Sequence, residues 1–180
     1  MYKIILMLSL MLFFQNDNEP VISWNDNYRL SWQDFKAQPM RNVGAVATTA
    51  SGITFGFSIR ESDKRVISFS TEVHAHFYPE QSWYKPERTD NHVLGHEQLH
   101  FDITELFARK FRKRISVLKT TNDVAKKLRA THEAINKELA AFQNQYDAET
   151  NFSRNVEAQL QWQILVKREL QKLESFKSKN

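Results

Sequence analysis

Glycine and proline are confined to the beginning of the chain, and this boundary constrains the fold more than any other feature. Both residue types interrupt regular helices, and residues 96–180 contain neither. The second half is therefore predicted to be helical, whereas the first half has the breakers that strands and turns use. The eight breakers are Pro20, Pro39, Gly44, Gly52, Gly56, Pro79, Pro86 and Gly95.

Alternating apolar and polar residues in the first half predict strands. The longest pattern covers residues 66–79, with a second over 52–59, a turn at Asp63 and Lys64, and a short strand at 21–24. On the long strand, one face would carry apolar side chains and the other His74 and His76. A short helix over residues 30–35 would be capped by Ser31.

The second half has the period of helices. Apolar residues recur at helical spacing over about 91–118, over 124–146 and over 153–176, with a turn at 120–123. The first two are expected to pair as an antiparallel hairpin, and the core residues expected on the third are Val156, Leu160, Ile164 and Leu173. The predicted fold is α+β: a small antiparallel sheet, then a helical hairpin and a third, C-terminal helix.

The first fourteen residues, MYKIILMLSLMLFF, have one lysine before an apolar run that is too short to span a membrane. Such a segment is typical of an export signal, so residues 1–17 are predicted to be a leader and residues 18–180 a single domain. The expected location is periplasmic or extracellular. The chain has no cysteine, so any metal site must use histidine and carboxylate ligands.

The sequence Gly95-His96-Glu97-Gln98-Leu99-His100 contains the pattern His-Glu-x-x-His. Within a helix, His96 and His100 project from one face and can bind one Zn²⁺. Glu97 is then placed to take a proton from a metal-bound water, which attacks a polarised carbonyl. The sequence thus predicts zinc as cofactor, His96 and His100 as ligands, and Glu97 as general base.

A catalytic zinc ion needs a third protein ligand and an open position. In a hairpin that turns near residues 120–121, Asp147 and Glu149 come level with the start of the histidine helix, and Asp147 is the ligand we expect. The Tyr146 hydroxyl could stabilise an oxyanion, although core packing is the simpler interpretation. His132 falls too far along the hairpin and is interpreted as a surface histidine.

Four further residues are candidates with simpler structural interpretations. His74 and His76 could face substrate, supply a third ligand or only meet solvent. Asp102 and Glu105 could accept hydrogen bonds from the ligating histidines, as carboxylates often do, or could support the helix through pairs such as Glu105 with Arg109.

The net charge is +4, and the basic residues of 109–114 are not interleaved with the aromatic side chains that bind single-stranded nucleic acid. No nucleic-acid partner is expected. A solvated helix face explains this run most simply, with weak association to an anionic envelope surface as the alternative. The expected partner is a peptide or protein substrate, bound by a monomer.

Three segments together resemble a known family: LSWQDF at 30–35, HEQLHFDITELFAR at 96–109, and Tyr146-Asp147-x-x-Thr150. The resemblance covers roughly residues 22–172 and is to the bacterial family called domain of unknown function 922, which is labelled as secreted zinc-dependent proteases. It implies a metallopeptidase of the His-Glu-x-x-His type.

The chain departs from the family pattern at one position. The family motif continues Tyr-Asp-x-x-Thr-x-His, and Phe152 stands where that histidine would be. If the histidine is the usual third ligand, the metal needs Asp147, Glu149, His74 or His76, or catalysis has been lost. If Asp147 is the usual ligand, nothing essential is missing.

Two functions are therefore expected from the sequence. The first is an exported zinc metallopeptidase that hydrolyses peptide bonds, or a related hydrolase acting on another amide such as a wall peptide. The second is a catalytically degenerate protease-like module that binds a peptide or a cell-envelope component.

Overall fold

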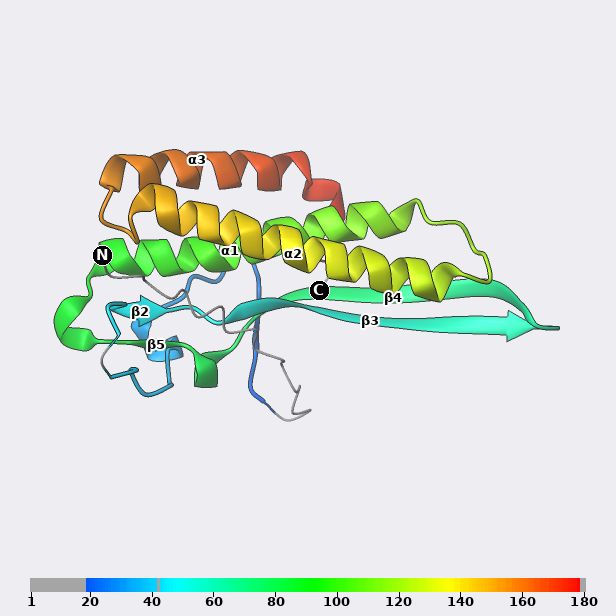
Figure 1. Ribbon diagram of the computed structural model, residues 1–180, viewed down its shortest axis with the longest axis horizontal. Coiled ribbons are helices and arrows are strands. Elements are labelled where there is room, and N and C mark those ends of the chain that lie inside the picture. The colour runs from blue at the N-terminus through cyan, green and yellow to red at the C-terminus, as the bar shows by residue number, and fades with distance from the viewer. Residues whose placement is uncertain (1–18, 42, 179–180) are drawn as a thin grey trace, which may run out of the picture.

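The computed structural model describes residues 19–178 except residue 42, so the predicted leader lies outside the described residues. Two long helices cover one face of a small antiparallel sheet, and a third packs on the outer side of those two (Figure 1). The predicted α+β architecture and its order along the chain are confirmed. A continuous core joins the two halves, from Trp24 and Phe77 in the sheet half to Leu106, Ile135 and Val166 in the helices.

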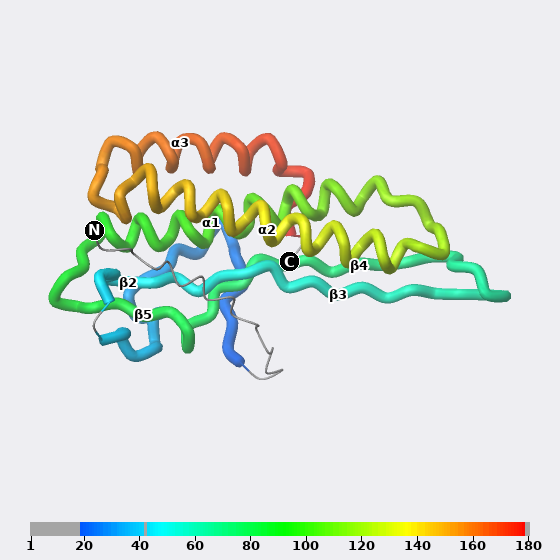
Figure 2. Tube along the Cα trace, in the orientation of Figure 1, coloured from blue at the N-terminus to red at the C-terminus, as the bar shows by residue number. Residues whose placement is uncertain are grey.

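The main sheet has the strand order β1-β4-β3, with β1 at Ile22–Ser23, β3 at Ser51–Ser62 and β4 at Arg65–Phe77. Asp63 and Lys64 join β3 to β4 with positive φ angles of 49° and 62°, as the type I′ turn of a two-residue β-hairpin requires. The hairpin extends beyond the ends of the helices (Figure 2). Strand β4 has a neighbour on each side, so β1 and β3 are the two edges of this sheet. Of these two edges, β3 lies nearer the helical hairpin.

A second, two-stranded sheet was not predicted. It pairs β2 at Ala47–Thr48 with β5 at Trp83–Tyr84, and two residues are too few to show an alternating pattern. The predicted short helix is a single 3₁₀ turn capped by Ser31. The 3₁₀ turns are Trp32–Asp34, Pro79–Gln81, Pro86–Arg88 and Glu174–Phe176.

The three long helices begin and end within six residues of the predicted positions. They are α1 at Asn91–Ser116, α2 at Val124–Thr150 and α3 at Val156–Lys172. Helix α1 is central, since it packs on the sheet and on both other helices, and Asp90 caps it by accepting a hydrogen bond from the Val93 amide. In the described part of the chain, none of the helices combines the length and apolar character that crossing a bilayer requires.

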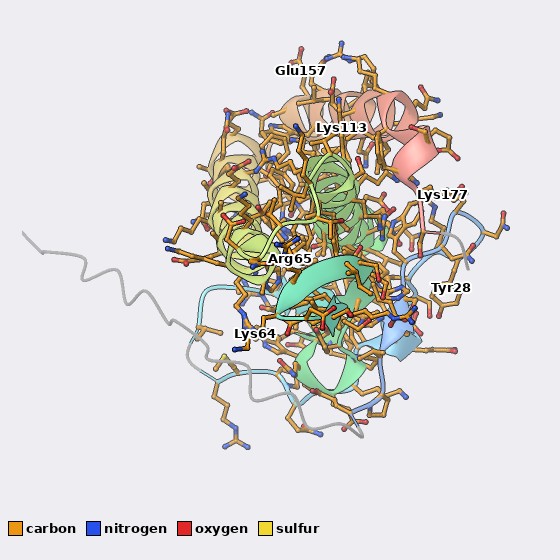
Figure 3. The ribbon with its side chains drawn as sticks, turned by 90° about the vertical axis from the view of Figure 1, so that its right-hand side faces the viewer. Tyr28, Lys64, Arg65, Lys113, Glu157 and Lys177 are labelled. Atoms are coloured by element: carbon orange, nitrogen blue, oxygen red, sulfur yellow. The ribbon has the colours of Figure 1, made fainter. Side chains whose placement is uncertain are left out.

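The predicted core of α3 is wrong for its first three members. Val156, Leu160 and Ile164 are 64%, 53% and 53% exposed, and the buried side chains are Gln159, Trp162 and Val166. Figure 3 shows the reason, because Glu157 of α3 lies on the far side of the helices from the sheet turn at Lys64 and Arg65. Helix α3 therefore has helices on one side only, and its buried face is the one that carries Trp162.

A buried ion network ties the sheet, α1 and the C-terminal segment together. Arg109 and Glu105 are each 1% exposed and are joined by a bond of 2.9 Å from Arg109 Nε to Glu105 Oε1. Arg112 also donates to Glu105 and to the Val73 carbonyl, and Arg109 donates to Glu174. Most of the basic run 109–114 is thus paired, because Arg114 also meets Glu138.

Glu105→Ala is expected to lower the free energy of unfolding by about 3–5 kcal/mol, because it leaves two arginines without their buried carboxylate. Urea unfolding followed by circular dichroism measures the change. Glu133→Ala is the matched control: it breaks the exposed pair with Lys137 and should leave the urea midpoint nearly unchanged. Equal midpoints for the two variants would contradict a structural role for the network.

Candidate metal centre

The hairpin of α1 and α2 brings His96, His100 and Asp147 together. The Nε2 atoms of His96 and His100 are each 3.1 Å from Oδ1 of Asp147 and 3.2 Å from one another. A tetrahedral zinc ion with bonds of about 2.0 Å separates its ligand atoms by about 3.3 Å. The three atoms therefore fit three corners of one such site and leave the fourth open.

The outer nitrogens of the two rings are held by glutamine side chains. Nδ1 of His96 lies 3.2 Å from Oε1 of Gln159, and Nδ1 of His100 contacts Oε1 of Gln143. The amide orientations are fixed, since Gln159 donates to the His92 carbonyl and Gln143 to the Thr104 hydroxyl. Amide oxygens can only accept, so each Nδ1 carries a proton, and in the neutral ring Nε2 keeps the lone pair that could bind a metal.

Three electron-rich atoms converge at this point, and such a group repels itself unless a cation lies among its members. One solution is protonation. Burial lowers the pKa of His100, but its hydrogen bond to Asp147 and the charges of Glu97 and Asp147 outweigh burial and raise that pKa overall. Burial likewise disfavours the Asp147 carboxylate, yet its contacts with both histidines hold its pKa below the usual value. A divalent metal is the other solution, and the donor set suits one.

Replacing the supporting glutamines tests this arrangement. Gln159→Leu and Gln143→Leu should each weaken metal affinity about 10–100-fold, because the ring loses the acceptor that fixes its tautomer and orientation. Competition with a chromophoric chelator measures the affinity. Gln145→Leu is the control, since Gln145 is exposed on the same helix and bonds only to Glu149 in the described contacts. Wild-type affinity in both site variants would show that the glutamines do not position the rings.

Glu97 lines the same cavity as the three converging atoms. The residue is 5% exposed, and among the described residues no hydrogen bond to its carboxylate is found, whereas its backbone carbonyl accepts one from Thr49. The cavity has a volume of about 550 Å³ and is closed on its other side by residues 44–49, which include β2. A carboxylate that is neither paired nor bonded can act on a molecule that enters this cavity.

Tyr146 takes a packing position rather than the predicted role on an oxyanion. It is fully buried, and its ring stacks on His96 with a centroid distance of 4.5 Å and meets His100 edge-on at 5.0 Å. Its hydroxyl is directed at the His96 carbonyl, 3.5 Å away. Burial and the nearby charges of Glu97 and Asp147 raise its pKa. The ring positions the histidines, and the hydroxyl does not line the cavity.

His74 and His76 lie away from the converging atoms. They stack on each other on the face of β4 that carries polar residues, while Val73, Ala75 and Phe77 point toward the helices. His76 bonds to Thr54 of β3. Alternation along the strand sends them to the sheet face opposite α1, so they are not among the three converging groups.

Asp102 and Glu105 are also placed elsewhere. Asp102 accepts hydrogen bonds from Trp24, Arg29 and Gln98, and Glu105 belongs to the buried ion network. Both are on α1 but point away from α2, so the prediction that they support the histidines is wrong. The other candidate carboxylate, Glu149, accepts from Trp162 Nε1 at 2.8 Å and is not among the converging groups.

Phe152 follows α2 in a turn of three consecutive residues with positive φ, Asn151, Phe152 and Ser153. The Phe152 side chain is 61% exposed and lines the rim of the cavity. Because Asp147 already completes the convergent group, the residue at position 152 belongs to the cavity wall. The departure from the family motif thus changes the wall and leaves the three candidate ligands intact.

His132 is half-buried rather than a surface residue, between Phe55 of β3 and Phe111 of α1. Sequence reasoning also missed both glutamines and residues 44–49. Gln143 had a usable signal, because it lies four residues before Asp147 and so shares its helix face, as His96 shares that of His100. Gln159 had none, since the apolar stripe through Val156 suggested another buried face.

A search of curated proteins and of solved structures finds no match to this chain. One family model matches, over residues 28–154, and its description is "Bacterial protein of unknown function (DUF922)". The match includes the two histidines, Glu97 and Asp147, and it covers more than half of the chain. The chain therefore belongs to the bacterial family of unknown function DUF922.

Proposed function

We propose that this protein is an exported zinc metallopeptidase. The observation that carries the proposal is the convergence of His96, His100 and Asp147 in a cavity that also holds the unpaired Glu97 carboxylate. Two imidazoles and one carboxylate form a ligand set of catalytic zinc enzymes, which keep one position open. A purely structural site would have four protein ligands and would not need a free carboxylate beside it.

Each residue has a defined part in hydrolysis. His96, His100 and Asp147 would hold the ion, which supplies Lewis acidity toward a carbonyl and lowers the pKa of water. Glu97 takes a proton from the attacking water and delivers it to the leaving amine. Tyr146 and the two glutamines keep the histidine rings in place, so little reorganisation is needed when substrate binds.

The wall opposite α1 favours a peptide as substrate. Val46 accepts a hydrogen bond from the Lys85 amide, so the pairing of β2 with β5 leaves the Ala47 amide and carbonyl directed away from β5. Residues 44–49 line the cavity, so this free backbone edge can pair with an extended chain. Residues 44–49 are therefore the proposed substrate-binding edge.

Export is proposed from the leader-like segment at residues 1–17. An envelope-surface partner has weaker support, since Arg109, Arg112 and Arg114 are paired with carboxylates and Lys113 is the exposed remainder of the run. The alternative function, a degenerate binding module, drew its support from Phe152. That support is reduced because position 152 is in the cavity wall.

The test is hydrolysis by the purified chain before and after a chelator, followed by return of single metals. We expect peptide cleavage that the chelator abolishes and one equivalent of zinc restores. Iron should be assayed in parallel, because two histidines and a carboxylate also suit ferrous iron. Cleavage that persists without metal would refute the proposal, and tight peptide binding without cleavage by the metal-loaded chain would favour the binding module.

A further inference from the structure

A second cavity of about 550 Å³ adjoins the candidate metal centre. It lies between β3 and α2, and it shares Gln143 and Asn144 with the cavity that holds Glu97. The two hollows are therefore neighbouring parts of one groove along α2. Resting on the proposed function, we infer that this second cavity is a remote subsite for an extended polypeptide substrate.

The sheet side of the subsite is the edge of β3 that no described strand pairs with. Ala50 accepts a hydrogen bond from the Tyr78 amide, so the β3–β4 ladder bonds alternate residues beginning with that pair. The amides and carbonyls of Ser51, Ile53 and Phe55 consequently point away from β4, toward α2. The His132 ring of α2 bonds to the Ile53 backbone, so this edge faces α2, and the backbone groups left for a substrate are those of Ser51 and Phe55. An extended chain can add to such an edge as a further strand.

The helix side supplies a mixed lining. Leu139 and Ala140 contribute apolar surface, and Asn136 and Asn144 contribute amide groups. With Ile53 and Phe55 on the opposite wall, this lining suits an apolar substrate side chain whose backbone is hydrogen-bonded. Ala140 is exposed and faces the groove without being part of the core, so the subsite can be filled without disturbing α2.

The helix also sets the length of chain needed. Asn136 lies three turns before Asp147, a distance of about 16 Å at 1.5 Å per residue. An extended peptide covers that distance with about five residues. The substrate class is therefore a polypeptide that continues about five residues beyond the scissile bond on one side, with an apolar side chain there. Dipeptides and short wall peptides would not reach the subsite.

The experiment compares Ala140→Trp, which fills the subsite, with Ala134→Trp, which places the same side chain on an exposed position of α2 that lines none of the described cavities. Cleaved members of a mixture of synthetic decapeptides are identified by mass spectrometry. Each is then remade without its four terminal residues at one end or the other. The readout is the ratio of kcat/KM for the long peptide to that for the better truncated one.

Wild type and Ala134→Trp should prefer the long peptides at least tenfold, and Ala140→Trp should lose most of that preference. The same preference in all three proteins, or none in wild type, would overturn the subsite while leaving peptidase activity standing. A binding measurement separates the two proposals further. The fluorescence anisotropy of labelled, unfolded casein reports its binding to the metal-loaded Glu97→Gln variant, with and without Ala140→Trp. Binding that Ala140→Trp weakens at least tenfold supports the subsite even if no peptide is cleaved; no binding and no cleavage overturns both.

Discussion

Glu97→Gln should abolish peptide hydrolysis while leaving the metal in place. Glutamine keeps the size of the side chain but cannot accept and return a proton, and loss of general acid–base catalysis costs about 10²–10⁴-fold in kcat. Glu97 is not among the three converging groups, so metal content should stay at the wild-type level. Steady-state kinetics and metal analysis on the same preparation give both numbers.

The control for this prediction is Gln98→Glu, which changes the neighbouring residue in the opposite sense. Gln98 points to the other side of α1, where it bonds to Leu30 and Asp102, so hydrolysis should persist. Wild-type activity in Glu97→Gln would exclude this carboxylate as the base. Loss of both activity and metal would show that Glu97 acts in the site's architecture instead.

Asp147→Ala should remove the tight metal site. It deletes one of three ligands, so affinity should fall more than the about 10–100-fold expected for a supporting residue. At free zinc of 100 times the wild-type Kd, wild type gains about 2.7 kcal/mol, whereas a variant with a Kd raised 100-fold gains about 0.4 kcal/mol. For a chain of this size the wild-type gain raises Tm by about 5–11 °C. Scanning calorimetry with and without zinc measures the difference.

Glu133→Ala controls for the lost charge, since Glu133 is an exposed carboxylate on the same helix. Its zinc-induced rise in Tm should equal that of wild type. A full rise in Asp147→Ala would contradict Asp147 as a ligand and would point to another group in its place.

The helical half and the histidine pair could be predicted because their signals are local. His96 and His100 are four residues apart, and the helical spacing over 124–146 with the turn near 120–121 located the hairpin closely enough to bring in Asp147. The actual contacts, His96 with Asp147 and His100 with Gln143, are displaced by two residues from the register that the turn predicts. A displacement that small still leaves Asp147 on the correct face.

What escaped prediction depends on contacts distant in sequence. Gln159 supports His96 only because α3 turns its Trp162 face inward, and the exposed stripe through Leu160 suggested the opposite. Residues 44–49 reach the cavity through a two-residue pairing of β2 with β5. His74 and His76 show the converse. The alternation along their strand was predicted correctly, but the sequence does not say which face of the sheet packs on α1, and that determines where the two histidines lie.

The proposed function requires one metal ion bound by His96, His100 and Asp147. Diffraction from crystals grown with zinc, recorded on both sides of the zinc absorption edge, tests this requirement. We expect one strong anomalous peak about 2.0–2.2 Å from Nε2 of each histidine and from a carboxylate oxygen of Asp147. A crystal without a peak there, or with zinc bound only elsewhere, would contradict it.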